Sequence, residues 1–180
     1  MSRFTLLFVF AALFLSACAN PATNQPKATT SEAAPVTKPA AGGEKYLITP
    51  ENSKIEFTGS KVTGSHNGSF QKFSGEVDYA GQPEKSVVKV TIEMNSVATE
   101  EADLTKHLQT PDFFDVQKFP QATFVSTEIK PGGEKGASHT VTGNLTLHGV
   151  TKAITFPATI TASRIIHPCS LTIDKTENAF

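Results

Sequence analysis

Alternation of apolar and polar residues is the feature that most constrains the fold of this chain. Between Val88 and Asn95 every second residue is apolar, and the residues between them are Lys, Thr, Glu and Asn. The same alternation occurs in residues 55–58, 73–79, 140–148 and 154–162. Successive side chains of a strand point to opposite faces, so this pattern indicates strands with one buried face each. Repeated strands of this kind predict an antiparallel all-β domain, and periodicity alone leaves both a sandwich and a barrel open.

Segments that contain glycine or proline separate the expected strands. They are Gly64–Gly68, Gly81–Pro83, Pro131–Gly136 and His148–Gly149, and such clusters are typical of turns. Pro157 has no amide hydrogen to give to a neighbouring strand, so we expect a bulge or a strand edge at this position.

One short helix is expected, from about Glu100 to Gln109. Thr99 is its expected N-cap, and the acidic residues that follow favour the positive end of the helix dipole. Leu104 and Leu108 are one turn apart and therefore share a face. Pro111 is expected to end the helix.

The N-terminus has the features of an export signal. Arg3 supplies a positive charge, and Phe4–Leu15 is an apolar run of about a dozen residues, shorter than the roughly 20 that span a membrane. The run ends in Leu-Ser-Ala-Cys, which matches a bacterial lipobox. We therefore expect a signal peptide over residues 1–17 and lipid attachment at Cys18. The alternative is an ordinary secretory peptide cut close to this cysteine.

The stretch that follows is expected to be a tether. From Ala19 to Lys45 the chain is rich in Ala, Pro, Thr and Lys, and such a segment buries too little apolar surface to order itself. We therefore assign residues 18–45 to a disordered tether with a reach of about 30 Å, and residues 46–180 to one domain. Ala19 is not the aspartate that commonly retains lipoproteins at the inner membrane. The expected location is the bacterial cell envelope, anchored to the outer membrane.

Charge and cysteine content limit the expected partners. The formal net charge is −1 and no block of basic residues occurs, so nucleic acid is not an expected partner. If Cys18 is lipidated, Cys169 has no intramolecular disulfide partner. It then either pairs between molecules or stays buried.

No catalytic or metal-binding motif is apparent. The 5 histidines show no zinc-ligand spacing, and the Gly-x-Ser-x-Gly nucleophile elbow is missing from the sequence. His107 and His148 are interpreted as structural, hydrogen-bonded residues. Asp112 and Asp115 are close enough in sequence for a carboxylate pair, but Asp112 follows a proline and is expected to cap a turn. We assign no catalytic residue, no metal and no cofactor.

Three segments have a more specific pattern than alternation alone. They are Lys61–Gly75, Ser96–Val116 with the expected helix and the run Pro-Asp-Phe-Phe-Asp-Val, and Thr142–Lys152 with the run Thr-Gly-Asn-Leu-Thr-Leu-His-Gly-Val-Thr-Lys. Together they resemble the YceI-like family. The first resembles the family's opening strand, loop and second strand, the second its helix-containing segment, and the third a further family segment. The resemblance covers most of Tyr46–Ala162. It implies an eight-stranded, antiparallel, lipocalin-like barrel with one short helix and an apolar lumen that holds a polyisoprenoid or an isoprenoid quinone.

The sequence departs from the family pattern near its end. Ser170–Glu177 begins a strand similar to the family's penultimate one, whereas Arg164–Cys169 breaks the expected alternation. We therefore expect the last strand to be missing. An incomplete barrel has two unpaired strand edges, which closure would have removed.

Large apolar residues are the expected ligand contacts, and the chain has 13 Phe and no Trp. The residues expected to line the lumen are Phe57, Phe70, Phe73, Val90, Ile92, Phe113, Phe114, Phe124, Leu145, Leu147, Ile154 and Phe156. An eight-stranded barrel either holds one slender ligand or is filled by its own side chains. Both alternatives stay open at the level of sequence.

The function implied by the resemblance is non-catalytic binding, sequestration or transport of an amphipathic isoprenoid lipid. The membrane is the second expected partner, through the lipid anchor, and a homodimer is left open. The alternative is a ligand-free envelope stress or interaction module with a side-chain-filled core. A hydrolase would be a third option, but it needs a pair of nucleophile and base that the sequence does not reveal.

Overall fold

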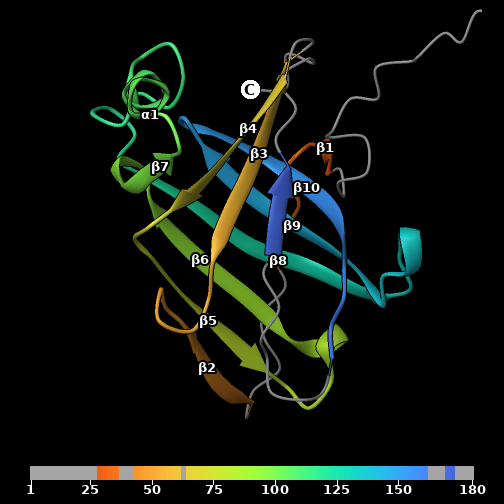
Figure 1. The fold of residues 1–180 in the computed structure, drawn as a ribbon. Coiled ribbons are helices and arrows are strands. Elements are labelled where there is room, and N and C mark those ends of the chain that lie inside the picture. The colour runs from red at the N-terminus through yellow and green to blue at the C-terminus, as the bar shows by residue number, and fades with distance from the viewer. Residues whose placement is uncertain (1–27, 37–42, 62–63, 162–168, 173–180) are drawn as a thin grey trace, which may run out of the picture.

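Two sheets face each other in the computed structural model, which describes residues 28–36, 43–61, 64–161 and 169–172. The seven-stranded sheet contains, in spatial order, β1 (Thr29–Ser31), β10 (Val150–Ala158), β9 (His139–Leu147), β8 (Gln121–Pro131), β6 (Val87–Glu93), β5 (Phe73–Tyr79) and β2 (Glu44–Ile48). The four-stranded sheet contains β11 (Cys169–Thr172), β3 (Ile55–Lys61), β4 (Gly64–Phe70) and β7 (Val97–Thr99). In Figure 1, β3 and β4 cross in front of β6, β8 and β9. The expected all-β architecture is confirmed.

Helical segments are short and lie at the ends of strands. The α-helix α1 covers Ala102–Gln109 and lies beside β7 (Figure 1). Single 3₁₀ turns are η2 (Pro83–Lys85), η3 (Met94–Ser96) and η4 (Glu134–Gly136). The described strand pairs are antiparallel except that β11 runs parallel to β3.

The start of the helix differs from the expectation. The helix begins at Ala102, and Glu101 occupies the N-cap, so the assignment of Thr99 as the N-cap was wrong. Thr99 is instead the last residue of β7, where it pairs with Gly68. Its hydroxyl donates to the carbonyl oxygen of Glu101 at 2.8 Å. The end of the helix is as expected, because Thr110 is its C-cap and Pro111 follows.

The segment Gly64–Gly68 is a strand and not a turn. It forms most of β4 and pairs in register with β3, with Gly68 opposite Phe57. A Cβ on Gly68 would lie 2.3 Å from Cζ of Phe57, so the phenyl ring covers the backbone where other strands carry a side chain. The strand therefore lacks the apolar alternation from which it could have been predicted.

The remaining turn and edge expectations agree with the structure. His148 and Gly149 connect β9 to β10 with φ values of 51° and 77°, and two positive φ values are characteristic of a type I′ hairpin turn. Pro157 stays in register opposite Thr140. Among the described residues, the edge strand β1 covers only Ala153–Thr155, so no described strand pairs with Pro157 on that side, which fits the predicted strand edge.

Part of the expected tether is ordered. In β1, Thr30 pairs with Ile154 of β10. The side chain of Asn144 donates to the carbonyl oxygen of Ala34 at 2.6 Å and accepts from its amide at 2.9 Å. Residues 28–36, which lie within the expected tether, thus contain an edge strand. The edge of β10 offers free backbone groups, to which an extended segment binds without apolar side chains.

Other expectations fall on residues that the structure does not describe. These are the signal peptide over residues 1–17, the lipid attachment at Cys18, the break in alternation over residues 164–168, and the missing last strand. Each of them stays a prediction.

Candidate functional site

The inward side chains of the central strands form continuous apolar rows. Val90 of β6 lies opposite Phe124 of β8, and Phe124 lies opposite Leu145 of β9. Cross-strand partners share a face of the sheet, and so do residues two apart along one strand. Phe156 therefore belongs to the same face, because its partner Val141 lies four residues from Leu145.

All residues predicted to line the lumen meet in one cluster between the two sheets. The buried members are Phe57, Phe70, Phe73, Ile92, Leu145, Leu147 and Ile154. The partly buried members are Val90, Phe113, Phe114, Phe124 and Phe156. The structure thus brings together side chains from β3, β4, β5, β6, β8, β9 and β10 and from the segment after α1. Whether they contact a ligand remains a prediction.

Aromatic side chains connect the parts of this apolar interior. The ring centroids of Phe57 and Phe70 are 5.5 Å apart, and Phe70 lies 6.1 Å from Phe114. Phe124 and Phe156 form a second pair at 5.9 Å. These spacings are usual for favourable aromatic pairs. Contacts between aromatic rings thus hold part of the apolar cluster together.

One open depression lies outside this interior. It has a volume of about 270 Å³ and is lined by Pro50, Lys72, Phe73, Ser74, Thr91 and Glu93. Phe73 is also one of the predicted lumen residues. Ser74 and Thr91 are a cross-strand pair between β5 and β6, one residue out of phase with the inward row. The depression therefore faces solvent on the outer side of the sheet and is not the expected lumen.

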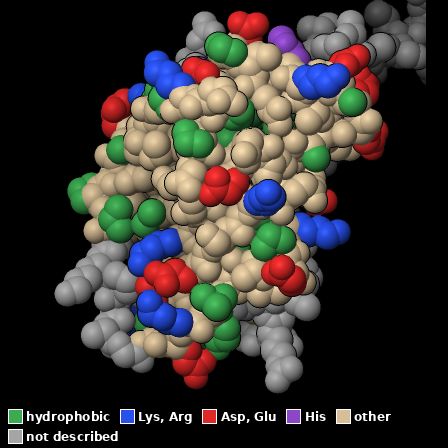
Figure 2. All heavy atoms as spheres, turned by 90° about the vertical axis from the view of Figure 1, so that its left-hand side faces the viewer, with side chains coloured by type: hydrophobic (Ala, Val, Ile, Leu, Met, Phe, Trp, Pro, Cys, Tyr) green, Lys and Arg blue, Asp and Glu red, His purple; other side chains and the backbone are tan. Residues whose placement is uncertain are grey.

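Polar contacts on the outer face of the same sheet form a network. The carboxylate of Glu76 accepts from Lys89 at 2.8 Å and from Lys45 at 3.3 Å, and both lysines also lie within 4.0 Å of Asp78. The hydrogen bond from Lys89, then that from Lys45, lowers the pKa of Glu76. Figure 2 shows acidic and basic side chains interspersed on the face that it presents, with separated hydrophobic side chains between them. No large single-sign patch stands out on that face.

The family of the chain follows from its sequence match. The model of the YceI-like domain matches residues 46–178. This chain belongs to the YceI-like family. The matched range covers the whole apolar cluster except Ala28, which packs against it from the N-terminal segment.

Individual relatives agree with this assignment. A UPF0312 protein of Pseudomonas putida is 46% identical over 94 residues, which are 52% of this chain and 48% of the relative. A UPF0312 protein of Yersinia enterocolitica is 46% identical over 95 residues, again 52% of this chain and 48% of the relative. The chain thus spans about half the length of the curated relatives it matches.

One solved structure supports this fold. The crystal structure of BcnA of Burkholderia cenocepacia has a TM-score of 0.57 and 28% identity, over 64% of this chain and 72% of that chain. A weaker likeness is to a polyisoprenoid binding domain of Saccharophagus degradans, with a TM-score of 0.45 and 17% identity, over 67% of this chain and 70% of that chain. Nothing is inferred from the second likeness.

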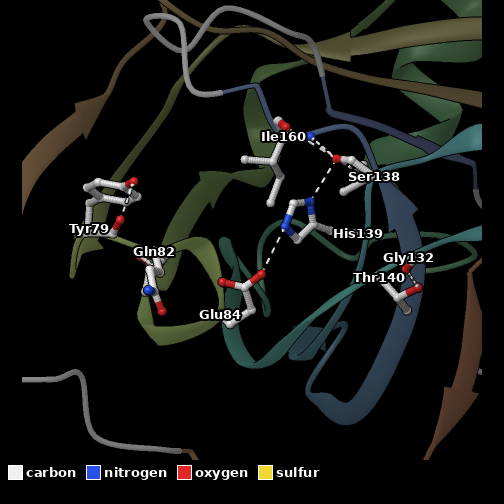
Figure 3. A network of polar contacts seen from close by, with 11 residues as sticks. Tyr79, Gln82, Glu84, Gly132, Ser138, His139, Thr140 and Ile160 are labelled. Carbon is white, nitrogen blue, oxygen red and sulfur yellow. Dashed lines mark hydrogen bonds and ion pairs between the residues drawn. The ribbon is translucent and has the colours of Figure 1, made fainter.

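The YceI-like domain of this chain also brings together a serine, a histidine and a glutamate that no sequence motif indicated. Oγ of Ser138 lies 2.8 Å from Nδ1 of His139, and Nε2 of His139 lies 3.4 Å from Oε1 of Glu84. Glu84 comes from η2, His139 is the first residue of β9, and Ser138 immediately precedes it (Figure 3). Because Glu84 is more than 50 residues from His139 in the sequence, no local spacing could have predicted the contact.

This arrangement differs from a catalytic triad. In such triads Nε2 of the histidine contacts the serine and Nδ1 contacts the acid, whereas here the two nitrogens are exchanged. The hydroxyl of Ser138 also accepts from the amide of Ile160 at 2.8 Å and lies 3.3 Å from the carbonyl oxygen of the same residue (Figure 3). The contacts therefore attach the segment after β10 to the start of β9, and they suit a structural role.

The two histidines of the family-like segments pack against aromatic rings. The ring centroids of His107 and Phe113 are 4.9 Å apart, and those of His148 and Phe119 are 4.8 Å apart, both edge-on. Across the described ranges, no group of three or more His, Cys, Asp or Glu side chains is arranged to hold a metal ion. Within the same ranges, no helix is long and apolar enough to cross a membrane.

Proposed function

We propose that this chain binds an amphipathic isoprenoid lipid without covalent chemistry and sequesters or carries it in the bacterial cell envelope. One observation carries the proposal: every residue predicted to line the lumen belongs to the same apolar cluster between the sheets. The proposal is supported by membership of the YceI-like family, whose resemblance first indicated an isoprenoid ligand.

Burial of an apolar chain supplies enough free energy for such a ligand. For large ligands about 0.3 kcal/mol per non-hydrogen atom is a fair ceiling, so a chain of roughly 40 carbons gains on the order of 12 kcal/mol. Binding sites for such ligands are mainly apolar and contain few polar groups. An interior of Phe, Leu, Ile and Val suits this kind of binding.

Partial exposure of several aromatic side chains of the cluster supports access from outside. Phe113 and Phe114, which follow α1, are only partly buried, and so are Phe124 and Phe156 on β8 and β10. These side chains keep contact with solvent although they belong to the apolar cluster. Exposed aromatic edges of this kind are the surface that a lipid chain would cover.

The membrane supplies the second part of the proposal. A lipid-modified Cys18 would carry several acyl chains, and more than one chain is needed for stable anchoring. The domain would then stay close to the outer membrane, where isoprenoid lipids can be exchanged with the bilayer. Detection of the acylated N-terminal cysteine by mass spectrometry of the mature protein tests this part separately.

A tryptophan scan at two matched valines tests the lipid-binding proposal. Val90 points into the interior, whereas Val125 lies opposite Lys89 and Asn144 on the outward row. We expect Val90→Trp to fold and to lose the co-purifying isoprenoid lipid, and Val125→Trp to retain it. In a ligand-free module with a filled core, no lipid is found in any variant, and Val90→Trp lowers the free energy of unfolding by about 1–3 kcal/mol through overpacking.

A further inference from the structure

A lysine interrupts the apolar interior of the seven-stranded sheet. Lys152 lies opposite Leu145 in the β9–β10 pair and two residues from Ile154, so it belongs to the inward row. On the inward rows of β6, β8, β9 and β10, all of which the structure describes, it is the only Asp, Glu, Lys or Arg. A charge next to an apolar interior is costly unless it has a partner. We therefore expect Lys152 to have an anionic partner.

An acidic side chain of the same chain forms an ion pair with this lysine. Nζ of Lys152 lies 2.8 Å from Oε1 of Glu32. The side chain of Glu32 is 91% exposed and that of Lys152 is 32% exposed. The carboxylate thus reaches the lysine from the solvent side, while the lysine lies at the rim of the apolar cluster.

The segment that carries Glu32 is held by few contacts. Within the described residues it pairs with β10 through Thr29, Thr30 and Ser31, the side chain of Asn144 binds the backbone of Ala34, and Ala28 packs against the apolar cluster. An ion pair this exposed adds little to stability. A ligand with a stronger negative charge can therefore displace Glu32 at small cost.

We infer that Lys152 is the site for an anionic, phosphate-type head group of the bound lipid, and that Glu32 is its intramolecular competitor. The inference rests on the proposed function and adds the chemistry of the head group. An isoprenoid chain that lies along Ile154 and Leu145 brings its polar end to Nζ of Lys152. Lysine is a common phosphate ligand in proteins, as a point charge with several donors.

Two probes that share one isoprenoid chain test this site in the full chain. Binding of geranylgeranyl phosphate and of geranylgeraniol is measured by equilibrium dialysis. Charge-assisted hydrogen bonds are strong, so we expect the phosphate to bind about tenfold more tightly than the alcohol. Lys152→Gln should reduce this ratio to about one, and Glu32→Gln should tighten binding of the phosphate about threefold while leaving the alcohol unchanged.

Lys89→Gln is the matched control, because this lysine lies on the outward row of β6. Its ratio of affinities should equal that of the wild type, and an equal loss in both lysine variants would overturn the inference. Equal affinity of the wild type for both probes would overturn it too, while leaving the proposed function in place. If neither probe binds, the proposed function itself fails. Inorganic phosphate should not displace geranylgeranyl phosphate when it is added at the concentration of geranylgeranyl phosphate that saturates the protein. Displacement would mean that the site takes free anions, which would overturn the assignment to a lipid head group.

Discussion

Gly143 lies directly beneath the phenyl ring of Phe124, and a Cβ at this glycine would be 2.3 Å from Cζ of the ring. The two residues come from neighbouring strands, β9 and β8, and both belong to the inward face. The ring therefore takes the space that a side chain at position 143 would need. This contact explains a glycine in the middle of a strand, where glycine is otherwise unfavourable.

Gly143→Ala is expected to destabilise the fold. The added methyl group must displace the Phe124 ring or shift the strand, which costs about 1–3 kcal/mol in the free energy of unfolding. Urea denaturation measures this difference. Gly59→Ala is the control: the nearest atom to its Cβ would be the carbonyl oxygen of His66 at 4.0 Å, so little change is expected. Equal effects of the two substitutions would contradict the role of the ring.

Two leucines allow the buried interior to be compared with the surface. Leu145 is 5% exposed and Leu47, on the edge strand β2, is 68% exposed. Leu145→Ala should lower the free energy of unfolding by about 2–5 kcal/mol, because it removes buried methyl groups and leaves a cavity. Leu47→Ala should change it by less than about 0.5 kcal/mol. Thermal or urea unfolding tests both, and a small effect of Leu145→Ala would mean that the interior is not packed around this residue.

The outer ion network should make stability depend on pH. Hydrogen bonds from Lys89 and Lys45 lower the pKa of Glu76 below its ordinary value of 4.5, so its stabilisation is present at neutral pH. It is lost as the pH falls below 4.5 and through the lowered pKa. The urea midpoint of Glu76→Gln should therefore be lower than that of the wild type at pH 7, and the difference should shrink on acidification and in high salt. A constant difference across this range would exclude the carboxylate as its cause.

Loosening the N-terminal segment should be visible in hydrogen exchange. Asn144→Ala removes both hydrogen bonds to the backbone of Ala34. We expect faster amide exchange in residues 28–36 and unchanged exchange in β8 and β9, read by mass spectrometry. Thr146→Ala is the control, since Thr146 lies on the same outward row and its hydroxyl contacts only Thr151 among the described hydrogen bonds. Unchanged exchange in the Asn144 variant would mean that other contacts hold the segment.

The parts of the fold that were predictable are those in which apolar and polar side chains alternate. The alternation predicted β6, β9 and β10 because Ile92, Leu145 and Ile154 need burial. It missed β4, where Gly68 makes room for a ring. It also missed β1, whose sequence Thr-Thr-Ser binds the edge of β10 through backbone groups alone.

The candidate site was predictable in its apolar part only. The predicted lumen residues that belong to strands lie in phase, so the sequence indicates which of them share a face. Phe113 and Phe114 follow α1 and have no such pattern. The contact between Glu84 and His139 joins distant segments and leaves no local signal. Lys152 did leave one, because it is in phase with Ile154 and therefore stands where an apolar residue is expected.

The content of the interior is the central question for this protein. The decisive measurement is mass spectrometry of lipids extracted from the full chain after purification without detergent from a bacterium that makes isoprenoid lipids. The account predicts an isoprenoid lipid in about equimolar amount, and the loss of this lipid in Val90→Trp. Protein that carries no lipid, with the side chains of both sheets in contact throughout the space between them, would contradict it.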